Sequence, residues 1–179
     1  LSYDVRRTNP NVSVSVYQNS WHPFVDNGSY ALKFNGSNYV DLGNPLSLRI
    51  TGDQTIAMWI KPNDFGSRRN PYGKAFGGEG NITVETDGKI TYYYGTCGGN
   101  CSPYQSFTMT SPLAPVVWMH IAIVRDLSNE KLRWYKNGVQ TNEATALYVS
   151  AGASSLSAFI AQGHVDRFRG DIDDVRIYN

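Results

Sequence analysis

Three segments of the chain carry the kinds of side chain that protein sites use to hold a sugar. Aromatic rings stack on the apolar faces of sugar rings, and planar guanidinium groups hydrogen-bond carboxylated sugars in pairs. We therefore take these segments as a candidate ligand site, with ordinary solvated loop residues as the alternative. The candidates are Arg68, Arg69 and Tyr72 in the first segment, Tyr104 and Gln105 in the second, and His164, Asp166 and Arg167 in the third.

The end of the sequence holds two adjacent carboxylates, Asp173 and Asp174, in an apolar run. Such a pair is costly to bury unless a cation or an arginine satisfies it. Calcium takes about six to eight oxygens from carboxylates and turn carbonyls, and a turn before residue 30 would supply some of them. The alternative is an ion pair with Arg176 or Lys33. The predicted calcium ligands are Asp173, which we prefer, with Asp174, Asp26, Asn27 and Gly28.

Catalytic groups are poorly represented. Glu85 and Asp87 are the nearest approach to a glycosidase pair, which needs two carboxylates about 5–9 Å apart across a cleft, but Asp87 belongs to an Asp-Gly turn. The histidines, His22, His120 and His164, form no metal or nucleophile set. Phosphate-binding, dinucleotide and Gly-x-Ser-x-Gly motifs are missing. We therefore expect no enzymatic activity.

The two cysteines, Cys97 and Cys101, are separated by Gly-Gly-Asn. These flexible residues let the sulfurs approach one another, whereas a metal site would need about four ligands and no histidine is near in sequence. We predict a disulfide that staples a loop, with two free thiols as the alternative. A disulfide favours an extracellular or cell-surface location.

Length and charge limit the possible partners. The 179 residues suffice for one domain with a sizeable core. A net charge of +1 gives no electrostatic case for binding nucleic acid or an anionic membrane, and no apolar run approaches about 18 residues, so we expect no membrane insertion. We treat residues 1–179 as one domain, with 1–11 as a possible linker from an upstream domain of a larger surface protein.

Alternation of apolar and polar residues, interrupted by turn signals, indicates an antiparallel all-β fold. Asn-Gly or Asp-Gly pairs at 35–36, 87–88 and 137–138 predict three hairpins. A first strand is expected over 12–16, near the final strand in space. Helical periodicity is almost absent, so about a dozen strands should form an antiparallel two-sheet sandwich.

The last strand, 168–179, is expected to pair with residues 30–34. Strict alternation would place Ile172, Asp174, Arg176 and Tyr178 on one face and Asp173, Val175 and Ile177 on the other.

Two long apolar segments, 55–62 and 117–126, predict strands that are covered on both faces. A further strand is expected over 156–161. Two other segments, 63–80 and 94–105, are longer than a hairpin needs and are expected to be irregular loops, which often carry function on a rigid sandwich.

Five motifs occur in a characteristic order: ALKFNGSNYVDL at 31–42, QTIAMWIKP at 54–62, WMHIAIV at 118–124, LRWYKNG at 132–138 and GDIDDVRIYN at 170–179. Together they resemble the LamG-like group of the concanavalin A-like lectin/glucanase superfamily. The resemblance implies a jelly roll of two curved antiparallel sheets, and many members bind one structural calcium. Members include laminin-type adhesion modules, carbohydrate-binding modules and glycosidases, and lectin-like tips of bacterial surface proteins and type IV pilins.

The resemblance and the residues together lead us to expect a non-catalytic extracellular recognition or adhesion module. Its expected partner is a glycan or glycoprotein on a cell surface. The first alternative is a protein-binding adhesion or structural spacer module, which would show an exposed apolar patch on one face. The second is a glycoside hydrolase or lyase.

Overall fold

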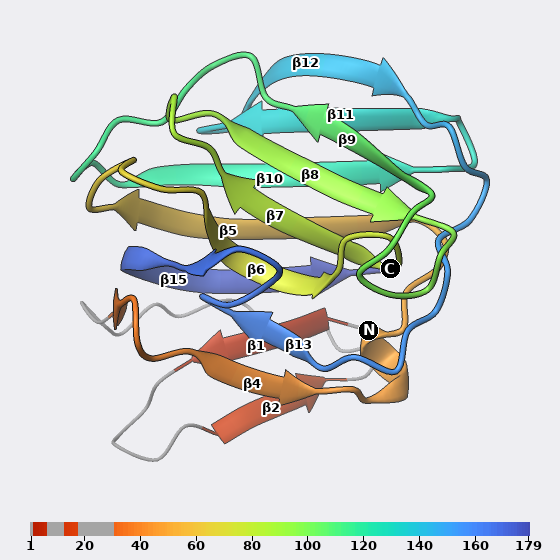
Figure 1. Ribbon diagram of the computed structural model, residues 1–179, viewed down its shortest axis with the longest axis horizontal. Helices are drawn as coiled ribbons and strands as arrows, with labels where there is room; N and C mark the ends of the chain where they lie inside the picture. Colours follow the sequence, from red (N-terminus) through yellow and green to blue (C-terminus); the bar gives the residue numbers. More distant parts are fainter. Residues whose placement is uncertain (1, 7–12, 18–30) are drawn as a thin grey trace.

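The computed structural model describes residues 31–179 with their side chains and, before them, only the backbone of two strands, 2–6 and 13–17. Two antiparallel sheets lie face to face (Figure 1). Within the described residues, the first sheet has the order β12-β11-β10-β5-β15-β1-β2, with β3 also paired to β15, and the second has the order β4-β13-β6-β7-β8-β9, with β14 paired to β6. The strands are β1 (Ser2–Arg6), β2 (Ser13–Tyr17), β3 (Leu32–Asn35), β4 (Val40–Gly43), β5 (Gln54–Pro62), β6 (Arg69–Ala75), β7 (Gly80–Val84), β8 (Ile90–Gly95), β9 (Tyr104–Thr108), β10 (Met119–Asp126), β11 (Lys131–Lys136), β12 (Val139–Thr145), β13 (Ala158–Ile160), β14 (Asp166–Arg167) and β15 (Arg169–Tyr178).

The expected all-β, two-sheet jelly-roll sandwich is confirmed. One short 3-10 helix, Leu46–Leu48, follows β4. The first predicted strand corresponds to β2, which joins the final strand through β1. The strand β1 lies inside the range where we expected a possible linker. No helix in the described part of the chain is both long and apolar enough to cross a membrane.

The strands of the first sheet bury one face. In β10, Met119, Ile121 and Ile123 are buried and alternate with half-exposed residues. In β5, the ring of Trp59 points outward and is 41% exposed. The prediction that both strands are covered on both faces was therefore wrong, because their outward positions also carry apolar residues and hide the alternation. The inner residues pack against the second sheet, and the indole of Trp134 donates to the carbonyl of Phe107 across the core at 2.9 Å.

The final strand, β15, pairs with β3 as predicted, but its faces differ from the prediction. A β-bulge between Asp173 and Arg176 sets an extra residue of β15 against β5. Asp174 adopts a φ of 47° there. Because the extra residue reverses the alternation, Ile172 and Val175 are both buried, together with Ile177. The expected division of this strand into faces was therefore wrong beyond residue 173.

Two of the three turn pairs join hairpins as predicted: Asp87-Gly88 joins β7 to β8, and Asn137-Gly138 joins β11 to β12. The pair at 35–36 does not, because β3 pairs with β15 whereas β4 pairs with β13 in the other sheet. The side chain of Asn35 accepts hydrogen bonds from the next backbone groups, and Gly36 has a φ of 89°. The turn therefore reverses the chain but carries it from one sheet to the other.

The segment 63–80 is not a loop, because β6 runs through it with all seven residues buried. Its outer side lies under residues 162–165: a Cβ at Gly73 would lie 2.5 Å from the carbonyl oxygen of Gln162. Asn70 accepts a hydrogen bond from the backbone of Val165. Pro71 and Gly73 disfavour a central strand, which explains why the sequence predicted a loop here.

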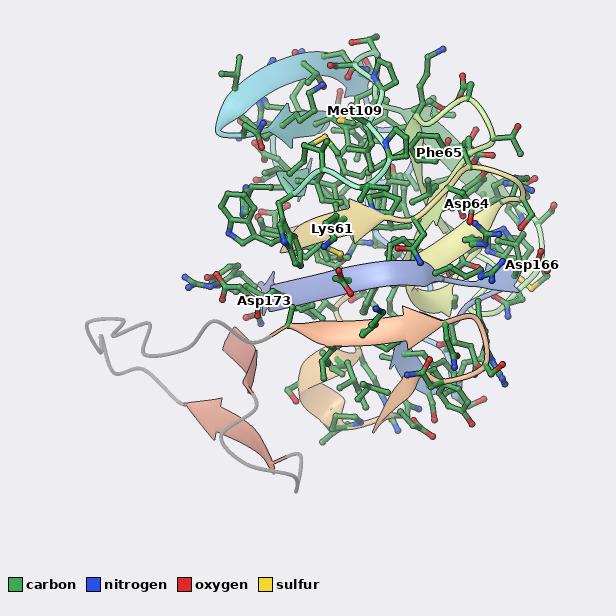
Figure 2. The ribbon with its side chains drawn as sticks, turned by 90° about the vertical axis from the view of Figure 1, so that its left-hand side faces the viewer. Lys61, Asp64, Phe65, Met109, Asp166 and Asp173 are labelled. Carbon is green, nitrogen blue, oxygen red and sulfur yellow. A yellow bond between two sulfur atoms is a disulfide. The ribbon has the colours of Figure 1, made fainter. Side chains whose placement is uncertain are left out.

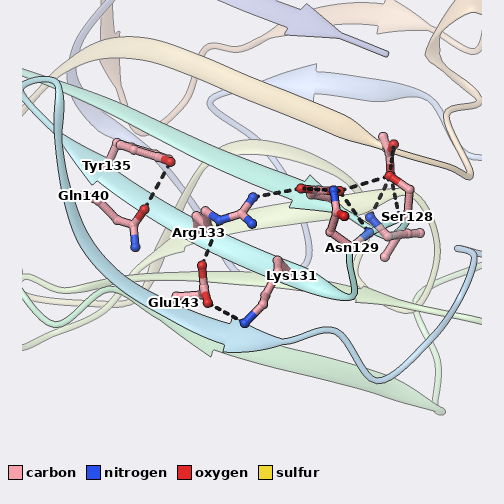
Figure 3. A network of polar contacts seen from close by, with 10 residues as sticks. Ser128, Asn129, Lys131, Arg133, Tyr135, Gln140 and Glu143 are labelled. Atoms are coloured by element: carbon pink, nitrogen blue, oxygen red, sulfur yellow. Dashed lines mark hydrogen bonds and ion pairs between the residues drawn. The ribbon is translucent and has the colours of Figure 1, made fainter.

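The edge of the first sheet at β12 carries a polar network on its surface (Figure 3). Arg133 bridges Asp126 and Glu143, which also binds Lys131. The hydrogen bond from Arg133, together with those from Asn129, lowers the pKa of Asp126 to about 2. Charged side chains of this kind discourage another strand from adding to an open edge.

Candidate functional site

The candidate site lies on the outer face of the second sheet, and alternation in β8 places its central residue. Tyr92 and Tyr94 are buried and stack on one another inside the core at 5.9 Å. Tyr93 lies between them and therefore points to the outside. It is only half-buried, because neighbouring aromatic rings surround it without covering it.

Four aromatic side chains gather at this place, and we call them, with Arg68 and Glu85, the aromatic site. The ring centroids of Phe76 and Tyr104 are 5.1 Å apart, and those of Phe76 and His164 are 4.9 Å apart. Tyr93 completes the group at 5.9 Å from Tyr104 and 5.4 Å from His164. Tyr104 is 42% exposed. The site therefore presents ring surface to solvent on a support of packed rings.

A charged pair adjoins these rings. The Nε atom of Arg68 donates to Glu85 at 2.7 Å, and its Nη2 atom donates to the hydroxyl of Tyr93 at 2.7 Å. The hydrogen bond with Glu85 raises the pKa of Arg68. Burial, followed by the charge of Glu85, raises the pKa of Tyr93. Since the Arg68 side chain is still 42% exposed, the site offers both donors and carboxylate oxygens beside an aromatic surface.

His164 packs edge-on to Tyr93 and at a tilt against Phe76. Burial and the nearby charge of Arg68 lower its pKa. Its Nδ1 atom is buried without a hydrogen-bond partner among the described residues.

We predict a pH-dependent stability that originates at His164. Its folded-state pKa is lowered, so the unfolded chain, with a histidine pKa of about 6.5, takes up the proton first as the pH falls. Stability should therefore be full above this value and decline below it, until folded His164 also protonates. Thermal unfolding at about pH 7.5 and about pH 5.5 would measure the decline.

The variant His164→Gln should show a smaller decline than the natural chain. Burial also lowers the pKa of His120, so His120→Gln serves as the matched variant for the remaining slope. An unchanged pH profile in His164→Gln would contradict the assignment.

The predicted disulfide between Cys97 and Cys101 is present, and it lies in a loop that supports the site. Gly77 donates to the carbonyl of Gly99, and the backbone N–H of Phe76 donates to the side chain of Asn100 at 3.2 Å. The stapled loop therefore packs on the β6–β7 turn next to two rings of the aromatic site.

Arg167 belongs to a second, smaller cluster. Its guanidinium lies 4.6 Å from the ring centroid of Tyr39, which packs edge-on against Phe159. It donates to the side chain of Gln162 and to the carbonyl of Ser37. Residues 162–167 connect this cluster with His164 of the aromatic site.

The remaining predicted ligand residues lie elsewhere. Tyr72 is 1% exposed and part of the core, so no sugar ring can reach it. Arg69 is buried and pairs with Asp64 at 2.5 Å. Gln105 ties the end of β12 to β9 through Thr145 and Leu147. Each was placed in a ligand site because its segment was expected to be a loop, or because its outward direction was assumed.

Three members of the aromatic site were missed: Phe76, Tyr93 and Glu85. The run Thr91-Tyr92-Tyr93-Tyr94 did carry a signal, because burying one face of it exposes Tyr93 on the other. The pairing of Arg68 with Glu85 joins residues 17 apart and follows from strand neighbours that the sequence did not reveal.

The predicted calcium ligands are described only in part. Asp26, Asn27 and Gly28 lie outside the described residues. Asp174 accepts a hydrogen bond from Arg176 at 2.8 Å, as the ion-pair alternative anticipated, and Asp173 accepts one from the backbone of Asp174. Nowhere in residues 31–179 do three or more His, Cys, Asp or Glu side chains gather as a metal site. These donors alone do not fit calcium, whose binding here stays a prediction.

Asp173 lies well apart from Asp166, which is close in sequence to His164 (Figure 2).

Comparisons with known structures place the fold. The structure resembles domain 4 of the GH43 extracellular arabinanase AbnA from Geobacillus stearothermophilus, solved with arabinotriose, at 20% identity with a TM-score of 0.64, covering 83% of this chain and 70% of that one. It also resembles the CBM40 of the Ruminococcus gnavus IT-sialidase bound to α2,3-sialyllactose, at 11% identity with a TM-score of 0.67 and coverage of 83% and 88%. Domains LG4-5 of the mouse laminin α1 chain match at 14% identity with a TM-score of 0.62 and coverage of 82% and 40%.

A search of curated protein sequences finds no match. The laminin G-type family model described as "Concanavalin A-like lectin/glucanases superfamily" matches residues 34–179. The match covers most of the chain, including β4 to β15 and every residue of the aromatic site. The chain therefore belongs to the laminin G-type family of the concanavalin A-like lectin/glucanase superfamily.

Proposed function

We propose that this chain is a non-catalytic carbohydrate-binding module whose ligand lies on the aromatic site. The observation that carries the proposal is the gathering of four rings with a partly exposed Arg68–Glu85 pair on the outer face of the second sheet. Tyr104 can stack on the apolar face of a sugar ring. Arg68, whose Nε and Nη2 groups are held by Glu85 and Tyr93, can donate from Nη1 to hydroxyl or carboxylate oxygens. Two of the similar structures were solved with oligosaccharides, which supports the ligand class.

The carboxylates near the site support a binding role. Glu85 accepts hydrogen bonds from Arg68 and from the hydroxyl of Tyr93. Asp87 is held in its turn by Lys89 through a backbone hydrogen bond and an ion pair. Both carboxylates therefore have structural partners within the fold. We infer a binding partner on a cell surface, in the extracellular setting that the disulfide favours.

The protein-binding alternative is favoured by a second aromatic surface, on the outer face of the first sheet. Trp59 packs edge-on against His120, and Lys61 lies over Trp118. Trp59 and Trp118 both remain partly exposed. A protein ligand of an adhesion module would be expected on this surface instead of the aromatic site.

A glycan array with and without calcium, followed by titration calorimetry on the tightest ligand, tests the proposal. We expect Tyr104→Ala to weaken that ligand at least about tenfold, or 1.4 kcal/mol, because the exposed ring is lost. Trp59→Ala is the matched variant, since its ring is almost equally exposed on the other sheet and should leave sugar affinity unchanged. The proposal fails if no glycan binds, or if Trp59→Ala abolishes binding and Tyr104→Ala does not. Release of reducing sugar from the bound glycan would overturn the non-catalytic assignment.

A further inference from the structure

A lysine, a glutamate and an asparagine meet beneath the open edge of the second sheet. Lys74 lies on β6, Glu79 in the turn after it, and Asn44 directly after β4. The side chains of Lys74 and Glu79 are both 0% exposed. A lysine amine and a glutamate carboxylate are rarely buried to this degree unless they are paired.

The amine is in contact with a carboxamide. The Nζ atom of Lys74 lies 2.6 Å from Oδ1 of Asn44 and 2.9 Å from the carbonyl oxygen of Leu156. Since a C=O bond is about 1.23 Å long, Cγ of Asn44 lies within about 3.8 Å of the amine. Reacting atoms in near-attack geometries are separated by about 3–3.5 Å, so only a small movement separates amine and carbonyl carbon from reaction.

The carboxamide orientation suits attack by an amine. The Nδ2 atom of Asn44 donates to the carbonyl of Ser154, and Oδ1 accepts from Nε of Arg49 at 3.3 Å as well as from Lys74. Because both cations contact one atom and a carbonyl contacts the other, the oxygen and nitrogen are assigned by the network. Arg49 polarises the carbonyl and would stabilise negative charge that develops on its oxygen.

Glu79 is placed to move the protons. Its Oε1 atom lies 3.5 Å from Nζ of Lys74 and accepts from the backbone of Ser154. Its Oε2 atom is buried and has no hydrogen-bond partner among the described residues. Burial lowers the pKa of Lys74, which favours the neutral, nucleophilic amine.

We propose that Lys74 and Asn44 form an intramolecular isopeptide bond, with Glu79 as the proton carrier. Glu79 takes a proton from the ammonium, and the neutral Nζ attacks Cγ of Asn44. A new C–N bond forms, and Glu79 passes the proton to the departing carboxamide nitrogen as the old C–N bond breaks. The new amide nitrogen gives up its second proton, again through Glu79, to the released ammonia. Lysine ammonium and asparagine carboxamide thus give a secondary amide and one ammonium ion, with no change of oxidation state and no other reactant.

The bond would join β4, the edge strand of the second sheet, to β6 across the intervening β13. The strand β4 has only four residues, so the covalent link would hold an edge that is otherwise secured by little pairing.

Peptide mass spectrometry tests the proposal on the natural chain, folded and incubated at neutral pH. Trypsin cleaves after Lys and Arg, but not at an acylated Lys74. A branched peptide joining residues 34–49 to residues 70–89 is therefore expected, lighter by one ammonia than the sum of its parts. Separate peptides with a cleavable Lys74 would overturn the proposal and leave the pair as a buried ion pair.

One comparison excludes another source of ammonia loss, and a second tests the role of Glu79. A succinimide at Asn35 or Asn137, each followed by glycine, also releases ammonia but gives no branched peptide. The variant Glu79→Gln should fold, as judged by circular dichroism, yet lack the branch. A branch in Glu79→Gln at the natural level would overturn the role of Glu79. Glycan binding is measured separately on the same samples, so that failure of this bond and failure of the proposed function are distinguishable.

Discussion

Replacing Arg125 with methionine is expected to lower the free energy of unfolding by about 3–5 kcal/mol. Arg125 is 1% exposed, and its guanidinium donates to the carbonyl oxygens of Gly52, Glu79 and Ile50 and to the hydroxyl of Tyr92. Methionine keeps much of the apolar stem but leaves these buried acceptors without their donor. A buried acceptor that loses its partner costs about 1–3 kcal/mol, and part of this is offset because the charge no longer has to be desolvated.

Urea unfolding measures the effect, and the matched variant is Arg133→Met. Arg133 also makes ion pairs, with Asp126 and Glu143, but in the surface network of Figure 3. Surface ion pairs contribute about 0–1 kcal/mol, so its loss should be small. Arg125 of β10 also links the two sheets, because it donates to Tyr92 of β8. If Arg125→Met were as stable as Arg133→Met, water would have to replace the guanidinium among these carbonyls, and this link would contribute nothing to stability.

The fold was largely predictable because period-two alternation and turn pairs are local signals. The hairpins at 87–88 and 137–138 follow from a turn residue with positive φ between strands of matching pattern. The turn at 35–36 carries the same signal, yet its two strands belong to different sheets. A turn sequence specifies reversal of the chain, whereas the pairing partner depends on residues far away, here β15 and β13.

Two other errors have the same physical origin. The strand β6 contains Pro71 and Gly73, so its local propensity opposes a strand, and only burial between β13 and β7 overrides it. The bulge at Asp174 shifts the alternation of β15 by one residue. The residues around Asp174 carry no local signal that predicts this bulge. Tertiary contacts therefore determine both the strand conformation of β6 and the side-chain directions in β15.

The candidate site was predictable only where direction followed from the strand. Arg68, Tyr104 and His164 were predicted and lie together, although they come from three segments. Alternation along a strand assigns each side chain to one face of the sheet. For this reason Tyr72 lies in the core, although we predicted it in the site, and Tyr93 lies in the site, although we did not predict it there. What the sequence could not give was the packing of residues 162–165 over β6, which brings His164 to the other rings.

The stapled loop and the aromatic site are physically connected at Gly77. A Cβ there would lie 1.9 Å from the carbonyl oxygen of Cys101, a backbone atom that cannot rotate away. The neighbouring Phe76 is hydrogen-bonded to Asn100 of the same loop, and Tyr104 follows the loop directly. The position of two rings of the site therefore depends on the close approach of this turn to the loop.

We expect Gly77→Ala to weaken glycan binding at least about tenfold, or 1.4 kcal/mol, while the sandwich remains folded. The added methyl group must push the loop away, at a cost of about 1–3 kcal/mol in stability. Phe76 and Tyr104 would then separate, because each is anchored to one side of the contact. Titration calorimetry with the ligand found on the array, together with urea unfolding, measures both effects.

Gly52→Ala is the matched variant for this change, because nothing lies within 4 Å of the Cβ that it adds. It should alter stability by no more than about 0.5 kcal/mol and leave binding unchanged. Suppose instead that Gly77→Ala bound the glycan as the natural chain does, with reduced stability. The loop would then serve the fold alone, and the ligand would have to contact the rings of Tyr93 and His164 without those of Phe76 and Tyr104.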